Sequence, residues 1–201
     1  MNSVRAFIAL PLPDPATRQL GQFISDLKSK APHGMRWVDI KNIHLTLVFL
    51  GETPPVKLDQ LAAQLAEVAS SFIAPIVKFT NLGAFPNPEK MRVFWLGLDS
   101  VPSLTEIHKR VNLACRQCSL PSDERRFLPH LTLARIPDAF THDGLAQAAK
   151  LINQPVPFSN RPLILDQMVL FKSDLQPGGA VYTPLHRFAL TKPQEVKSER
   201  T

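Results

Sequence analysis

The chain has 201 residues, of which 44% are apolar, which allows one substantial core or two small lobes and excludes a mainly disordered protein. The longest nearly uncharged apolar run, Ile43 to Gly51, is less than half of the roughly 20 residues that a membrane helix needs. The first ten residues also lack a secretion-signal pattern. We therefore expect a cytoplasmic protein without a membrane segment. With 23 basic and 17 acidic side chains the net charge is +6, which favours a polyanionic partner such as RNA over a cationic one.

Hydrophobic periodicity in the first half of the chain predicts the order β, α, β, α, β. Asp14 followed by Pro15 is typical of a helix start, and leucines at helical spacing mark a second helix before residue 70. The predicted elements are a strand at 4–10, a helix from Asp14, extended segments at 36–38 and 43–50, a helix at about 56–70 and a strand at 72–80.

The same order begins again after the turn-rich segment 81–90. The predicted elements are a strand at 91–98, a helix at 103–118, a strand at 128–135, a helix at 144–153, strands at 156–158 and 163–171, and a last strand at 181–190 without a counterpart in the first half. Matched landmarks keep nearly one offset, 87 between Val4 and Met91 and 86 between His44 and His130. This regularity indicates an internal repeat with copies at approximately 4–80 and 91–172.

The repeat predicts an α+β fold with two pseudo-symmetric lobes, each a β-sheet with outer helices, around a central cleft. We expect residues 1–190 to form this single bilobal domain and the weakly apolar tail 191–201 to be mobile. Two lobes from one chain need no second subunit, so the sequence predicts a monomer. Cys115 and Cys118 come late in a helical pattern, so we interpret them as core residues and not as a zinc or redox pair.

One tetrapeptide occurs at equivalent places in both copies, His44-Leu45-Thr46-Leu47 and His130-Leu131-Thr132-Leu133. Because side chains alternate along a strand, each copy places its histidine and threonine on one face and its leucines on the other. A single such motif is typical of an ordinary packed or surface histidine. Two copies at matched positions indicate paired sites that converge on one groove.

Two imidazoles with hydroxyls between them form an acid and base pair. Histidine titrates near pH 6.5, so one imidazole can accept a proton while the other donates one. Thr46 and Thr132 can donate hydrogen bonds to phosphate oxygens, and in-line displacement at phosphorus needs this combination. The residues alone leave the two histidine roles exchangeable. They also leave open a metal-dependent phosphoesterase with both histidines as ligands, and an RNA-binding module without turnover.

The paired motifs, with the surrounding segments RAFIALPLP, RWVDIKNIHLTLVFLGE, VFWLGL and RRFLPHLTLAR, resemble the 2H phosphoesterase superfamily. Within this superfamily they resemble the RNA 2',3'-cyclic phosphodiesterase family, also called 2'-5' RNA ligases, and the resemblance extends from about Arg5 to Leu190. It implies a hydrolase without metal or cofactor that opens a terminal 2',3'-cyclic phosphate on RNA or a nucleotide and leaves a 2'-phosphate. It further implies His44 as proton donor and His130 as proton acceptor. Ligation or cleavage of 2'-5' linkages at the same site is the alternative activity.

Five residues beyond each histidine the copies diverge, to Phe49 and Arg135. The resemblance implies that Arg135 approaches the phosphate with Thr46 and Thr132, and that Phe49 lines the nucleotide pocket. Strict alternation would place Arg135 on the face opposite His130, so we expect a bulge or a strand end there. For Phe49, core packing is the alternative. Tyr182 is a further candidate for the rim of the groove, and Arg36 and Arg125 are weaker candidates for contacts with RNA.

Overall fold

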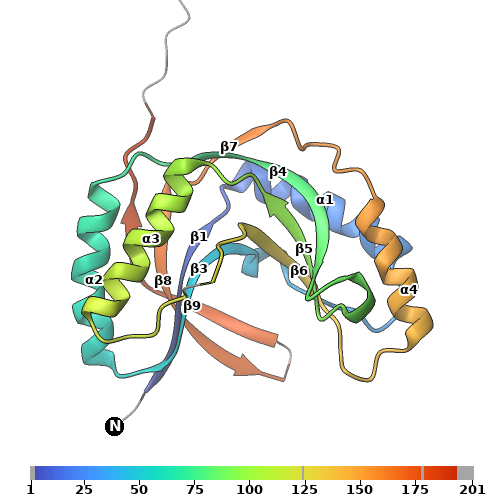
Figure 1. Cartoon of the computed structure of the whole chain (residues 1–201), viewed down its shortest axis with the longest axis horizontal. Coiled ribbons are helices and arrows are strands. Elements are labelled where there is room, and N and C mark those ends of the chain that lie inside the picture. Colours follow the sequence, from blue (N-terminus) through green and yellow to red (C-terminus); the bar gives the residue numbers. More distant parts are fainter. Residues whose placement is uncertain (1–2, 124, 178, 194–201) are drawn as a thin grey trace, which may run out of the picture.

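The computed structural model of the protein describes residues 3–123, 125–177 and 179–193 (Figure 1). Its strands are β1 (Val4–Pro11), β2 (Arg36–Trp37), β3 (His44–Thr53), β4 (Ile76–Phe85), β5 (Val93–Leu98), β6 (His130–Arg135), β7 (Pro162–Ile164), β8 (Gln167–Gln176) and β9 (Gly179–Ala189). Its helices are α1 (Asp14–Lys30), α2 (Pro55–Ser70), α3 (Pro102–Gln117) and α4 (His142–Lys150), with 3-10 turns η1 (Ile40–Asn42), η2 (Pro88–Lys90) and η3 (Leu151–Asn153). The α+β class predicted from the sequence is confirmed.

The strands form one antiparallel sheet in the order β7-β4-β5-β6-β3-β1-β8-β9, with β2 paired to β6. The centre of this order is the junction between β3 and β6, where a single residue pair, Leu45 with Leu131, is in register. On either side the arrangement repeats, because β1 follows β3 and β5 follows β6. The sheet therefore consists of two half-sheets joined at the two motif strands.

The half-sheets are not the two sequence copies. Strand β4 from the first copy pairs with β5, and β8 from the second copy pairs with β1. Each copy thus contributes its third long strand to the other half, and β9 then extends the half-sheet that contains β1. This exchange joins the copies into one hydrophobic core.

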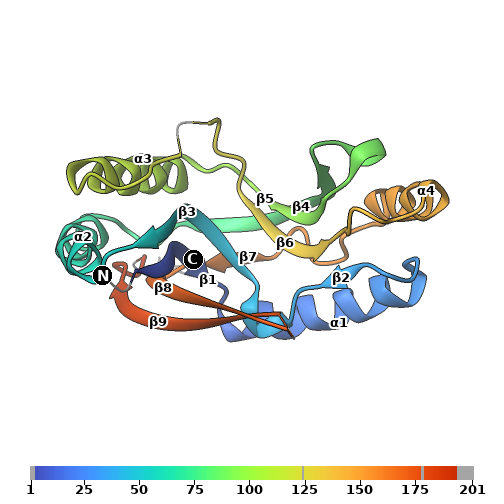
Figure 2. The same cartoon turned by 90° about the horizontal axis from the view of Figure 1, so that it is seen from below.

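The helices lie in two pairs at opposite ends of the molecule, α2 with α3 and α1 with α4 (Figures 1 and 2). Helices α1, α2 and α3 each have proline in the first turn, where the missing N–H costs nothing. Their apolar faces are buried, as Leu20, Leu61 and Leu104 illustrate with no exposed surface. The helices therefore cover the core face of the sheet and leave the opposite face for the motifs.

Several predicted boundaries were wrong. Strand β4 continues through 81–85, where we expected turns, and pairs there with β5. Residues 157–160 form a turn where a strand was expected at 156–158. The start of the tail is fixed, because the Thr191 carbonyl accepts a hydrogen bond from the Ala74 amide at 2.7 Å. The rest of the predicted mobile tail, 194–201, lies outside the described residues.

Cys115 is buried in α3, as the core interpretation predicts, whereas Cys118, just after the helix, is only partly buried. Burial raises the pKa of Cys115 to about 12, so its thiolate is not accessible near neutral pH. No helix in the described ranges has the length and apolar character needed to cross a bilayer.

Candidate active site

The two motif strands are neighbours at the centre of the sheet. Leu45 of β3 lies opposite Leu131 of β6, and neither leucine has any exposed surface. The register that this pair sets aligns His44 with Thr132 and Thr46 with His130. Each imidazole therefore stands beside the hydroxyl of the other copy.

His44, Thr46, His130 and Thr132 are all partly exposed, whereas the leucines between them are buried. The four polar residues consequently share the face of the sheet that is turned away from the core, which we call the motif face. Strand geometry separates the two histidines by about 7 Å along the strands and about 5 Å across them. A phosphate group between them would have an imidazole on either side.

Each histidine is oriented by the same backbone contact. His44 Nδ1 lies 2.8 Å from the carbonyl oxygen of Asn42, and His130 Nδ1 lies 2.7 Å from that of Leu128. A carbonyl oxygen only accepts, so Nδ1 must carry the proton in both rings. Both Nε2 atoms are then left to accept a proton when neutral or to donate one when charged.

A β-bulge in each motif strand sets the positions of Phe49 and Arg135. In β3, Ala9 pairs with Thr46 and Ile8 with Val48, so Leu47 is the extra residue. In β6, Trp95 pairs with Thr132 and Phe94 with Ala134, so Leu133 is the extra residue. The extra residue in each strand reverses the alternation that follows it.

The bulges bring both divergent residues to the motif face. Arg135 is exposed and pairs with Val93, which lies on the same side of β5 as Trp95, the partner of Thr132. Phe49 is 60% exposed, so its alternative assignment as a core residue is wrong. The bulge that we expected near Arg135 is confirmed, and its twin in β3 was not anticipated.

Aromatic rings surround His44. Phe7 stacks on the imidazole with centroids 4.8 Å apart, and Tyr182 meets it edge-on at 5.3 Å. Phe171 lies beside both rings, with its centroid 5.1 Å from that of Phe7 and 6.1 Å from that of His44. Burial among these rings lowers the pKa of His44 to about 4, although the bond to the Asn42 carbonyl acts in the opposite direction. Tyr182, predicted only as a rim residue, thus forms part of the wall around His44.

His130 has a more open aromatic environment. Phe85 meets its ring edge-on at 4.9 Å, and Trp95 lies tilted at 6.2 Å. Burial lowers the pKa of His130 as well, opposed by the bond to the Leu128 carbonyl. Both imidazoles are therefore neutral in the free protein near pH 7.

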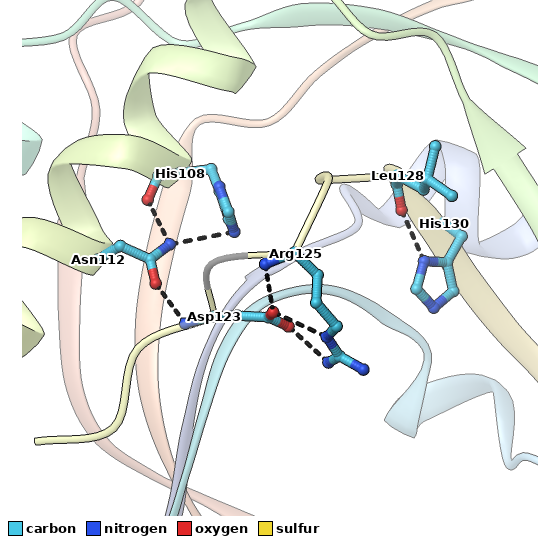
Figure 3. Close-up of polar contacts among 6 residues, drawn as sticks. All are labelled: His108, Asn112, Asp123, Arg125, Leu128 and His130. Atoms are coloured by element: carbon cyan, nitrogen blue, oxygen red, sulfur yellow. Dashed lines mark hydrogen bonds and ion pairs between the residues drawn. The ribbon is translucent and has the colours of Figure 1, made fainter.

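The loop before β6 is attached to α3 by a buried polar cluster (Figure 3). The Asn112 side chain donates to His108 Nε2 at 3.1 Å and accepts from the Asp123 amide at 2.6 Å. His108 stacks on Phe127 with ring centroids 4.0 Å apart and is buried. The loop fixed in this way carries the Leu128 carbonyl that orients His130.

Asp123 and Arg125 form a two-pronged ion pair, with Nε to Oδ1 at 2.9 Å and Nη2 to Oδ2 at 2.6 Å. Arg125, through this side-chain hydrogen bond, lowers the pKa of Asp123. Together with Ser122 and Phe49 these two residues line an open cavity of about 620 Å³. An exposed aromatic ring and a guanidinium that line one open cavity form an arrangement that can accept a nucleobase.

The structure thus brings together all seven predicted site residues on one face or its rim. Sequence reasoning missed Phe7 and Trp95, although their offset of 88 nearly matches the repeat and was a usable signal. It also missed the backbone carbonyls two residues before each histidine. In residues 3–123, 125–177 and 179–193, no three His, Cys, Asp or Glu side chains gather in a group that could hold a metal ion.

This fold and paired-histidine face define the class of protein. The structure matches the apo structure of E. coli LigT with a TM-score of 0.74 and 27% identity, over 95% of this chain and 99% of that one. E. coli LigT has also been solved with 3'-AMP and with phosphate. The chain therefore has the fold of the LigT-like phosphoesterases.

Residues 13–174 match the 2'-5' RNA ligase superfamily, and the chain belongs to this family. A relative named RNA 2',3'-cyclic phosphodiesterase from Methanothermobacter thermautotrophicus is 27% identical over 187 residues, 93% of this chain and 99% of the relative. Another with that name, from Geobacillus stearothermophilus, is 29% identical over 88% of this chain, which spans only 54% of that longer relative. The family resemblance noted in the sequence is confirmed.

Proposed function

We propose that this chain is an RNA 2',3'-cyclic phosphodiesterase that hydrolyses a terminal 2',3'-cyclic phosphate to a 2'-phosphate. The observation that carries the proposal is the pair of imidazoles on the motif face, each with Nδ1 bound to a carbonyl and Nε2 left for proton transfer. The relatives that bear this activity in their names extend over nearly all of the chain. The binding of 3'-AMP and phosphate by E. coli LigT fits a nucleotide phosphate as substrate.

In the proposed reaction a water oxygen attacks phosphorus while His130 Nε2 takes its proton. The bond from phosphorus to the 3'-oxygen breaks, and the Nε2 proton of His44 goes to that oxygen. Thr46, Thr132 and Arg135 stabilise the negative charge on the non-bridging oxygens. His130 ends protonated and His44 neutral, and exchange with water restores both.

The charge of the bound phosphate has a definite part in this scheme. Both imidazoles have lowered pKa values in the free protein, so the donor must be protonated as the anion binds, because a nearby negative charge favours the imidazolium. Deeper burial makes His44 the harder ring to protonate, which by itself favours His130 as donor. The family resemblance supports His44 as proton donor and His130 as proton acceptor. A substrate with a modified leaving oxygen tests this assignment directly.

The primary experiment incubates the protein, in the presence of EDTA, with a short RNA that ends in a 2',3'-cyclic phosphate. We expect a 2'-phosphate product, identified by phosphorus NMR, and undiminished activity, because the site residues already account for proton transfer and phosphate binding. Activity that vanishes with EDTA and returns with a divalent metal would overturn the metal-independent scheme. A mainly 3'-phosphate product would reverse the assigned orientation.

A second experiment identifies the donor with a cyclic substrate whose 3'-oxygen is replaced by sulfur, since a thiolate leaves without a proton. The variant that lacks the acid should recover on this substrate, and the variant that lacks the base should not. Recovery of His44→Ala supports His44 as donor. Recovery of His130→Ala alone would exchange the two roles.

Ligation is a second candidate activity, because the family is described as the 2'-5' RNA ligase superfamily. Attack of an RNA 5'-hydroxyl on the cyclic phosphate, or on the reverse path cleavage of a 2'-5' linkage, would use the same acid and base. We further propose that the protein acts as a monomer, since one chain supplies every residue of the motif face. The proposed location is the cytoplasm. Sedimentation analysis tests the monomer, and fractionation of cells tests the location.

A further inference from the structure

Arg36 stands directly opposite Arg135 across the pairing of β2 with β6. Directly opposed residues in an antiparallel pair project from the same face, so Arg36 shares the motif face with Arg135. The next pair confirms the orientation, because Trp37 lies opposite the buried Ala134 and packs edge-on against Phe94 in the core. The motif face therefore ends in two adjacent, exposed guanidinium groups.

The backbone holds Arg36 firmly in this place. The Val38 amide donates to the carbonyl of Leu133, the bulged residue of β6, at 2.9 Å. The bulge that turns Arg135 to the motif face thus also fixes the strand that carries Arg36. The juxtaposition of the two arginines is a consequence of the sheet and not of a loose loop.

No ion pair neutralises these two charges within the part of the chain that the structure describes. The neighbouring carboxylates already have other cations, since Asp39 pairs with Lys41 at 3.3 Å and Asp138 with Arg92 at 2.7 Å. Like charges in directly opposed strand positions repel each other and destabilise the pair. An arrangement that costs stability and leaves two guanidiniums facing outward is typical of an anion site.

The opposite end of the motif face differs in charge. At the repeat offset, Phe49 corresponds approximately to Arg135, and Ser122 or Asp123 corresponds to Arg36. There the guanidinium of Arg125 is held by Asp123 in the cavity that Phe49 also lines. One end therefore suits a base, and the other end suits a phosphate.

We propose that Arg36 binds a second phosphate, the phosphodiester on the 5' side of the nucleotide that carries the cyclic phosphate. This inference rests on the proposed function. Arg135 lies three residues beyond Thr132, or roughly 10 Å along the strand. Adjacent phosphates of an RNA strand are separated by one ribose, so Arg135 can reach the reacting phosphate while Arg36 meets the next one. The site thereby selects the end of an RNA chain over a cyclic nucleotide without a 5'-phosphate.

The test compares three substrates, adenosine 2',3'-cyclic phosphate, its 5'-phosphorylated form, and the dinucleotide ApA with a terminal cyclic phosphate. We expect the second and third to exceed the first in kcat/KM by roughly tenfold, as for one charge-assisted phosphate contact. Arg36→Gln should reduce this ratio to near one. Arg110→Gln, at an exposed position on α3, is the matched control and should keep the wild-type ratio.

Two further measurements separate a binding role from a structural one. Arg36→Gln removes the repulsion between the arginines, so its melting temperature should equal or exceed that of the wild type. The dependence of log kcat/KM on log salt for the dinucleotide should become shallower by about 0.7, the value for one phosphate contact on a single strand.

An unchanged substrate ratio in Arg36→Gln, or a preference for the dinucleotide without any gain from the 5'-phosphate, overturns the second phosphate site. Failure of the proposed function has a different signature, because the wild-type protein would then hydrolyse none of the three substrates.

Discussion

His44 and His130 occupy equivalent positions, yet their environments differ. Both donate through Nδ1 to a carbonyl two residues earlier and both stand beside a threonine of the other copy. Around His44, however, β8 and β9 add Phe171 and Tyr182, while the half-sheet of His130 has no strand beside β4 at the level of Phe85 in the described chain. The repeat therefore fixes the geometry of proton transfer, and the added strand makes the two proton affinities unequal.

The largest expected effect concerns proton transfer, the role that the two histidines share. His44→Ala and His130→Ala should each lower kcat by roughly 10² to 10⁴, the usual range for a general acid or base, and the double variant should lose less than the product of the two. Steady-state kinetics on a cyclic-phosphate RNA measures this. His186→Ala, at an exposed position on β9, is the control and should keep its activity. Near-normal turnover in either single variant removes that histidine from the mechanism.

The next effect tests the cationic end of the motif face. Arg135→Ala should lower kcat/KM by roughly ten- to a hundredfold, because a hydrogen bond between charged partners is lost at the phosphate. Arg135→Lys keeps the charge but not the two-pronged geometry and should fall between the alanine variant and the wild type. Equal activity in all three proteins would exclude a phosphate contact.

The loss of stability at acid pH tests whether the two histidines differ in proton affinity. The folded-state pKa of His44 is lowered from 6.5 to about 4, so the unfolded chain binds its proton more tightly. The contribution of neutral His44 to the free energy of unfolding is therefore fully present above pH 6.5 and is lost as the pH falls toward 4. The loss is roughly 3 kcal/mol, at about 1.4 kcal/mol per pKa unit. Urea unfolding at pH 7 and 4.5 measures this loss.

His44→Gln should show the smaller loss between these two pH values, because glutamine does not titrate. His186→Gln, the matched control, should lose as much as the wild type. Equal losses in wild type and His44→Gln would show that burial does not control the proton affinity of His44.

Tyr182 offers a more local test of the same inequality. Tyr182→Ala opens the wall around His44 to water, so the pKa of His44 should rise toward its ordinary value, as NMR titration of the imidazole protons can measure. Tyr182→Phe retains the ring and should leave that pKa low. A pKa that stays low in the alanine variant would assign the effect to Phe7 and Phe171 alone.

The smallest expected effect concerns Phe49, which stands where the other copy has Arg135. Phe49→Ala should leave most of the rate intact but let some 3'-phosphate appear among the products, because the ring that fixes the ribose is gone. Phe49→Tyr should retain the wild-type product ratio. An alanine variant with unchanged rate and products would show that the exposed ring does not contact the substrate.

The sequence by itself determined the α+β class, the repeat and the pair of motifs. These features are local, since strand alternation places His44 with Thr46 and proline starts the helices whichever way the chain is finally folded. The turn-rich composition of 81–90 was misleading because pairing with β5 overrides the local preference at 81–85.

Only the tertiary structure decided how the two copies combine. The exchange of β4 and β8, the bulges at Leu47 and Leu133, and the opposition of Arg36 to Arg135 all depend on pairing between residues far apart in the chain. The same holds for the unequal burial of two histidines in identical motifs. A pKa responds to the side chains packed around an imidazole, and for His44 these come from β1, β8 and β9.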